Sequence, residues 1–193
     1  MVTVLAGIAA LVFLKGSANG FSARAEPSAF EGLLAKAARR MAIPAGAREK
    51  QNPVAASKEV LDGAMEHWAD HCAGCHANDG SGRGGMGEQM YPPAPDMRKA
   101  ETQNRTDGEL FYIIENGIRL TGMPAWGGTG PGGERASWAL VRFIRHLPEL
   151  TAAEKAEMEK LNPKGPEDRA QEQAEEDFLN GKSVPETASP HRH

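Results

Sequence analysis

The chain has 193 residues, a formal net charge of -4 and 40% hydrophobic residues, a composition that suits one compact domain with flanking segments. Aromatic residues make up only 6%, whereas 22 glycines and 13 prolines predict short helices joined by long loops. A mildly acidic chain gives no reason to propose nucleic-acid binding, so no nucleic-acid partner is expected.

The chain opens on an apolar run from Val2 to Leu14. This run resembles the apolar core of a secretory signal peptide and is shorter than the ~20 residues that span a bilayer. The small residues Ala23 and Ala25 predict cleavage after Ala25. Because no Lys or Arg precedes the run, a longer, uncleaved membrane anchor is the alternative. Residues 1–25 therefore predict export, with the protein either released or anchored.

Residues 26–53 are predicted to be a juxtamembrane amphipathic segment and linker. Ser28 and Glu31 have the spacing of a capping box. Apolar residues follow at helical spacing, with basic residues between them: Phe30, Leu33, Leu34, Ala37 and Met41, then Lys36, Arg39 and Arg40. Such a helix can lie on an anionic membrane surface, and packing on its own domain is the alternative.

Residues 54–148 have the character of a globular domain. Helices are expected over 54–72, 105–117 and 134–147, because apolar residues recur there at helical spacing. The stretches between them are rich in glycine and proline and are predicted to be loops. No strand pattern occurs, which indicates an all-α fold. Residues 149–193 are predicted to be an acidic helical or disordered tail, with Met158 outside the globular part.

Both cysteines of the chain lie in the sequence CAGCH, as Cys72 and Cys75 followed by His76. A zinc site needs about four ligands, and no second cysteine pair is present. A thioredoxin-like redox motif belongs between a strand and a helix, whereas this motif follows a predicted helix. Cys-x-x-Cys-His is also the signature of covalent haem attachment, in which both thiols bond one haem and the histidine reaches its iron.

A haem that only transfers electrons needs a second axial ligand, and methionine is a common one. Met123 stands between Gly122 and Pro124 in a loop between two predicted helices, where glycine permits close approach and proline stiffens the loop. Met86, Met90 and Met97 are the alternatives. The histidines that precede the motif, His67 and His71, are expected on the solvent side of the first helix.

The order of helix, CAGCH, glycine-rich loop, helix, GMPAW and final helix resembles class I mono-haem cytochrome c, of the membrane-associated or periplasmic bacterial type found in respiratory complexes. The resemblance covers residues 54–148. It implies three to five short helices wrapped around one covalent haem c, long loops, and a location at the periplasmic face. It also implies axial ligation by His76 and Met123.

The same resemblance assigns roles to further residues. The first and last helices are expected to cross near Ala64 and Trp68, with Leu140 and Phe143 on the partner face. A proline carbonyl, that of Pro92 or Pro93, is expected to accept the ring N–H of the axial histidine. Arg119 and Trp126 are expected near the haem edge, where their N–H groups can meet the propionates.

The function that follows is one-electron transfer between redox partner proteins, without catalysis by the chain itself and with membrane association through the N-terminus. A haem c subunit of a periplasmic dehydrogenase or oxidase is the first alternative. A haem-based sensor or enzyme, in which Met123 gives way to a small ligand, is the second.

Overall fold

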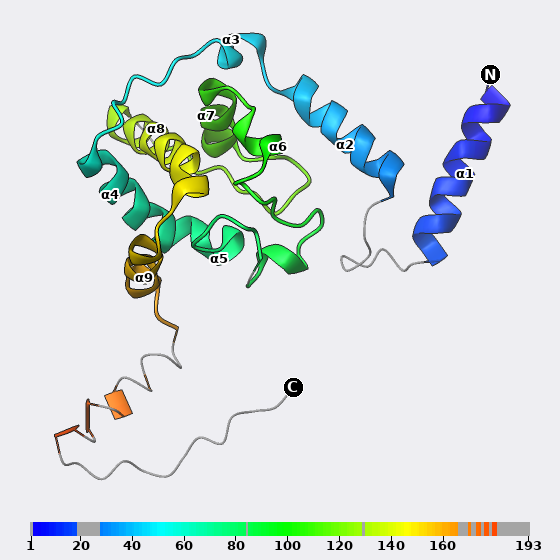
Figure 1. Ribbon diagram of the computed structural model, residues 1–193. Helices are drawn as coiled ribbons and strands as arrows, with labels where there is room; N and C mark the ends of the chain where they lie inside the picture. Colours follow the sequence, from blue (N-terminus) through cyan, green and yellow to red (C-terminus); the bar gives the residue numbers. More distant parts are fainter. Residues whose placement is uncertain are drawn as a thin grey trace. The chain divides into compact units, whose positions relative to one another are not determined.

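The computed structural model describes residues 2–18, 28–83, 85–128 and 130–165, together with single positions between 170 and 180. All regular structure in this described part is helical, so the all-α fold expected from the sequence is confirmed (Figure 1). The chain divides into two units, residues 1–161 and 162–193. The predicted cleavage site after Ala25 and the C-terminal residues beyond 180 lie outside the described residues.

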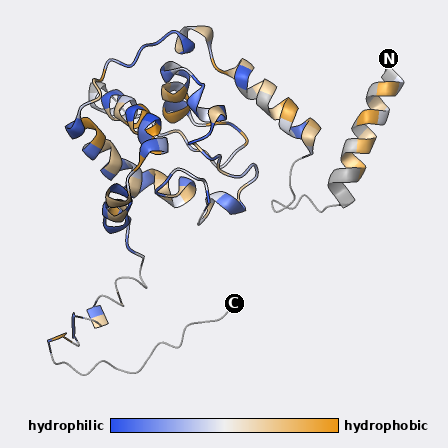
Figure 2. Cartoon of the chain, in the orientation of Figure 1, coloured by the Kyte–Doolittle hydropathy of each residue, from blue (hydrophilic) through white to orange (hydrophobic). Residues whose placement is uncertain are grey.

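Two helices precede the globular domain. Helix α1 (Val2–Ala18) is mostly apolar, and hydrophobic colours recur along its first turns in Figure 2. Helix α2 (Ala29–Ala42) begins at the predicted capping box, since the Ser28 hydroxyl accepts from the Glu31 amide and the Glu31 carboxylate accepts from the Ser28 amide. Of the helices in the described residues, none has the length and apolar character required to cross a membrane.

The end of the predicted segment 26–53 packs on the domain. Short helix α3 (Ala45–Arg48) contacts helix α7 (Asp107–Asn116), and Ala47 is buried. The Asn52 side-chain amide donates to the Trp138 carbonyl at 3.0 Å. Few apolar side chains mark this stretch, and hydrogen bonds hold it to the domain.

The core forms where the first helix of the domain crosses the last. Helix α4 (Lys58–His67) packs against helix α8 (Pro131–His146), as expected. Trp68 is buried against Phe143, with ring centroids 5.6 Å apart. Other buried residues from α7 and α8 complete the core, among them Leu110, Phe111, Ile114, Trp138, Leu140, Val141 and Ile144.

The first helix does not stop at Cys72. It continues through a π-helical turn, η1 (Trp68–Cys72), into helix α5 (Ala73–His76). Beyond it, the described residues of the predicted loop contain one short 3₁₀ turn, η2 (Gly87–Gln89), before helix α6 (Ala100–Gln103). Between residues 58 and 146 the described chain has five α-helices, in keeping with the three to five short helices expected.

Helix α9 (Ala152–Leu161) follows a 3₁₀ turn, η3 (Leu147–Glu149), and packs against α4 and η1. Its Met158 is completely buried, with 0% exposure. The expectation that Met158 lies outside the globular part was therefore wrong. The apolar residues of this segment that pack on the core, Leu147, Leu150, Met158 and Leu161, are too widely and unevenly spaced to give a clear periodic signal in the sequence.

Candidate functional site: a haem-binding pocket

The helix that carries the Cys-x-x-Cys-His motif is fixed at its base by Trp68. The Trp68 indole N–H donates to the Ala77 carbonyl at 3.1 Å, which ties the π-helical turn to the residue after His76. The indole also lies against the His76 ring, with centroids 5.8 Å apart. Trp68 therefore links the buried core directly to the part of the helix that presents His76.

His76 has the properties of a side chain that can bind a metal ion. Its side chain is only 8% exposed, and its Nδ1 is buried without a hydrogen-bond partner among the described residues. Burial lowers the pKa of His76, which favours the neutral imidazole that can bind a metal ion. A buried, unpartnered ring nitrogen costs free energy, so Nδ1 calls for an acceptor such as the proline carbonyl expected beside it, which would leave the other ring nitrogen to bind a metal ion.

The two cysteines are free thiols in this structure. Burial, with a smaller contribution from neighbouring Cys75, raises the pKa of Cys72 to about 12. Thiols that act in redox exchange have a lowered pKa, because the thiolate is the nucleophile. Cys72 therefore lacks the environment of a redox cysteine. Among the described residues no group of three or more His, Cys, Asp or Glu is placed to hold a metal ion, so a four-ligand zinc site is not formed either.

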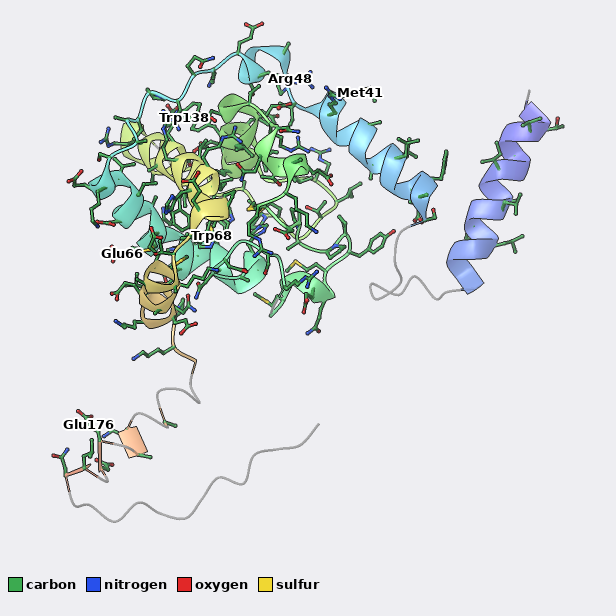
Figure 3. All side chains as sticks on the ribbon, viewed as in Figure 1. Met41, Arg48, Glu66, Trp68, Trp138 and Glu176 are labelled. Carbon is green, nitrogen blue, oxygen red and sulfur yellow. The ribbon has the colours of Figure 1, made fainter. Side chains whose placement is uncertain are left out.

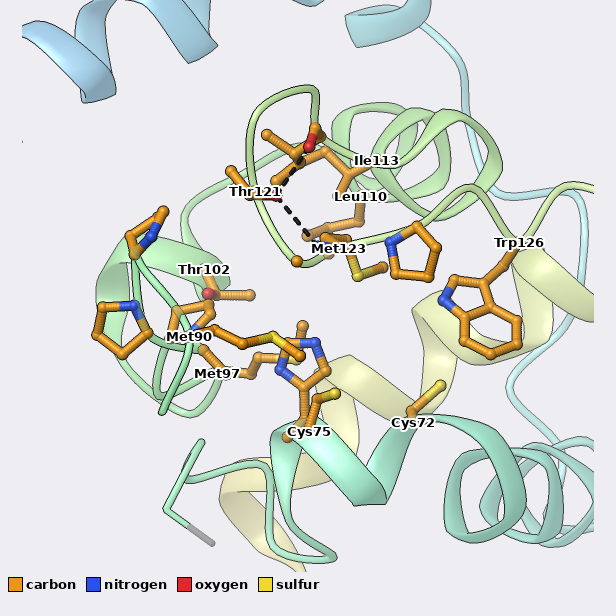
Figure 4. A pocket seen from close by; sticks show the side chains of 18 of the residues that line it. Cys72, Cys75, Met90, Met97, Thr102, Leu110, Ile113, Thr121, Met123 and Trp126 are labelled. Atoms are coloured by element: carbon orange, nitrogen blue, oxygen red, sulfur yellow. Dashed lines mark hydrogen bonds between the residues drawn. The ribbon is translucent and has the colours of Figure 1, made fainter. Parts of the chain in front are cut away.

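A large pocket opens beside these residues. The empty space inside it is about 1010 Å³, a volume that includes the open solvent at its mouth. In Figure 4, Cys72 and Cys75 extend from the helix on one side, and Met123 enters from a loop on the opposite side. Apolar side chains supply much of the wall, including Leu110, Ile113, Ile118, Met90 and Met97.

The Met123 loop is held by hydrogen bonds within itself. The Thr121 hydroxyl donates to the Ile118 carbonyl at 2.8 Å and accepts from the Met123 amide at 3.1 Å. The Ile118 amide in turn donates to the Met123 carbonyl at 3.1 Å. Leu120, at the tip, has a positive φ of 63°, a conformation that non-glycine residues rarely adopt. This network fixes the backbone of Met123 without using the methionine side chain, which remains available to the pocket.

Gly117 closes the same loop onto helix α7. Its φ is +64°, and a Cβ there would lie 2.6 Å from the Pro124 carbonyl carbon. The chain after Met123 also returns to α7, because the Trp126 amide donates to the Ile114 carbonyl at 2.9 Å. The loop is thus attached to the helix on both sides of Met123.

The opposite loop, residues 77–99, carries the prolines. Pro92 and Pro93 line the pocket, as does Pro95. Arg98 holds this loop together, since its guanidinium donates to Asp79 at 2.7 Å and to Asp96 at 2.8 Å. The hydrogen bond from Arg98 lowers the pKa of Asp96 to about 2. Because His76 Nδ1 has no partner here, the expected bond to a Pro92 or Pro93 carbonyl stays a prediction.

The last two predicted site residues, Trp126 and Arg119, differ in their position relative to the pocket. Trp126 lines the pocket, whereas Arg119 is exposed and does not belong to the lining residues. The structure adds lining residues to which the sequence did not point, among them Thr102, Arg105 and Leu110. His71 is exposed, as expected, and it also lines the pocket with its ring 5.5 Å from the Trp126 ring.

The methionines predicted as alternatives to Met123 also differ in their position relative to the pocket. Met90 and Met97 share the pocket with Met123, whereas Met86 is exposed outside it. The Met90 sulfur lies close to Gly122, where an added Cβ would be only 2.2 Å away. The structure therefore reduces the alternatives to Met123 from three to two.

Two thiols and an imidazole on one wall of an apolar pocket, with a thioether on the other, fit a covalently attached haem. A helical domain built around such a pocket defines the class of c-type haem proteins. Comparison with family models agrees, since residues 59–144 match the model described as cytochrome C oxidase, cbb3-type, subunit III. These residues are a cytochrome c domain of that type. Comparison with curated proteins gave no match.

Proposed function

We propose that this chain is a c-type cytochrome that transfers single electrons, with one haem c bonded through Cys72 and Cys75 and ligated by His76 and Met123. The observation that supports this proposal most is the pocket, which brings both halves of the ligand set together although they are far apart in the sequence. When bound, the haem supplies an iron that gains and loses one electron reversibly.

The residues of the chain have separate tasks in this proposal. Cys72 and Cys75 hold the group, and the neutral His76 imidazole provides the proximal ligand. The Met123 thioether raises the reduction potential, because a soft ligand favours ferrous iron. The apolar wall excludes water and strengthens this effect. Pro92 or Pro93 is proposed to orient His76, while Arg119 and Trp126 are proposed to meet the propionates.

The proposed place of this protein is the periplasmic face of a membrane, after export directed by residues 1–25. Its partners are redox proteins that donate and accept the electron, through small and transient contacts. The chain is proposed to act as a carrier and not as an enzyme. Membrane association through the N-terminal segment belongs to the same proposal.

A second candidate is a haem-carrying subunit of an oxidase or dehydrogenase complex. The printed description of the matching family model, an oxidase subunit, favours it. Gentle solubilisation followed by affinity purification distinguishes the two. A carrier purifies alone, whereas a subunit brings the larger enzyme with it in fixed stoichiometry.

A visible spectrum with a redox titration tests the proposal directly. We expect low-spin haem with a thioether-to-iron charge-transfer band. Met123→Ala is expected to abolish this band and lower the potential while the haem stays attached, and Met86→Ala, outside the pocket, is the matched control. Loss of the band in Met90→Ala or Met97→Ala instead would reassign the distal ligand, and high-spin iron that binds CO readily in the unaltered protein would refute electron transfer as the function.

A further inference from the structure

Helix α2 has an apolar face that nothing in the described part of the chain covers. Four large apolar side chains on it, those of Phe30, Leu33, Leu34 and Met41, are between 59% and 80% exposed. Their spacing places them on one side of the helix. Figure 3 shows Met41 projecting away from the helix, in contrast with Trp68 and Trp138 inside the domain.

The sequence of α2 favours a helix with a defined start, so its exposed apolar face needs an explanation. Its N-terminus has a complete capping box between Ser28 and Glu31. Helix α8 has a comparable separation of apolar and polar residues, and its apolar face is buried, with Val141 completely inside the domain. In proteins, the stability of a helix of this length comes mainly from burial of its apolar face. An amphipathic helix that stays exposed therefore indicates a partner outside the domain.

The charge of α2 indicates the chemistry of that partner. The helix contains three basic residues, Lys36, Arg39 and Arg40, against one acid, Glu31. Glu31 is occupied by the cap and by a hydrogen bond from the Tyr91 hydroxyl at 3.2 Å. The helix is thus a basic segment in a chain of net charge -4, which fits an anionic surface.

The neighbouring segment indicates that this surface is a lipid bilayer. Helix α1, only ten residues before α2, also exposes large apolar side chains, among them Leu11, Phe13 and Leu14. Basic residues near an anionic leaflet and apolar side chains at its acyl boundary are the two contributions that hold interfacial helices. An acidic protein groove would match the charge of α2 but gives no reason for a second exposed apolar helix that precedes it in the chain.

We propose that α2 lies in the plane of an anionic phospholipid surface, with its apolar face inserted at the headgroup boundary. This extends the membrane association in the proposed function, on which it rests, by naming the element and the lipid charge. Such a helix would keep the haem domain close to the membrane whether residues 1–25 are retained or removed.

Limited trypsin digestion of the full haem-loaded chain tests this proposal. Trypsin cleaves after Lys36, Arg39 and Arg40, and cleavage after the exposed Lys160 in the same molecule is the internal reference. Vesicles of phosphatidylglycerol and phosphatidylcholine are expected to slow cleavage within α2 by about tenfold or more, because proteolysis follows the population of the accessible state. Pure phosphatidylcholine vesicles are expected to leave it unchanged.

Two double variants test whether the apolar face of α2 is the one that contacts the lipid. Leu33→Asn with Leu34→Asn is expected to abolish protection. Gly32→Asn with Ala35→Asn, outside the apolar face, is expected to retain it; an added Cβ at Gly32 meets nothing within 4 Å.

Equal protection by both kinds of vesicle, or none by either, would overturn the proposal. So would protection that rises with protein concentration in the absence of vesicles, which would make a second copy the partner. A visible spectrum of the same sample reports separately on the haem, so failure of the proposed function is distinguishable.

Discussion

The position of Met158 predicts that helix α9 stabilises the cytochrome c domain, although it lies beyond the matched residues 59–144. Met158 is completely buried, and α9 packs against the helix that carries the cysteines. Truncation of a buried methionine to alanine typically costs ~2–5 kcal/mol. Since domains of this kind have only ~5–15 kcal/mol of stability, Met158→Ala should remove a large share of it. With ~2–8 °C lost per kcal/mol, the melting temperature should fall by on the order of 10 °C.

The assay is guanidinium unfolding of the haem-loaded protein followed by far-ultraviolet circular dichroism. Met41→Ala is the matched control, because Met41 is 80% exposed and its truncation should change stability by less than ~0.5 kcal/mol. If both variants unfolded at the same denaturant concentration, α9 would not pack on the domain in solution, and the reasoning would fail.

Three further variants probe other contacts. Thr121→Val removes the hydroxyl that holds the Met123 amide and should weaken the thioether-to-iron bond by ~1 kcal/mol, seen as loss of its charge-transfer band at lower denaturant. Partial burial opposes ionisation of Glu154, but hydrogen bonds from Thr151 and His146 outweigh it and lower the pKa of Glu154 to about 2. The ionised carboxylate therefore stabilises the fold above its ordinary pKa of 4.5, and this contribution is lost as pH falls towards 2. Glu154→Gln should flatten the stability profile in that window. Gly117→Ala, at positive φ with no room for a Cβ, should destabilise strongly, whereas Gly132→Ala should not.

Much of the site could be predicted because its chemically important residues lie in short, unusual sequence motifs. The spacing of Cys72, Cys75 and His76 is itself a constraint of covalent attachment, and the Gly–Met–Pro sequence around Met123 is a local loop signal. The all-α fold was predicted from the lack of a strand pattern, and the helix crossing at Trp68 was predicted from the resemblance to class I cytochrome c. The capping box at Ser28 was also confirmed, because it depends only on residues within one turn.

The elements that were missed depend on contacts between distant segments. Residues 43–54 are held by Asn52 and by Arg142, whose guanidinium donates to the Val54 carbonyl at 2.8 Å, and such bonds leave no periodic pattern. Helix α9 joins the core through Met158 and through the His146–Glu154 pair at 2.7 Å. None of these contacts has a signature within a sequence window.

The π-helical turn over Trp68–Cys72 has a consequence for how the domain tolerates changes in length. The turn contains one residue more than regular α-helical geometry requires, so it sets the rotational phase between the core end of the helix and its haem-binding end. Deleting one residue there would restore regular α-helical winding and remove the wide turn from which the Trp68 indole reaches the Ala77 carbonyl. The segment from Trp68 to Cys72 is therefore expected to keep its length, and length variation should be confined to the loops.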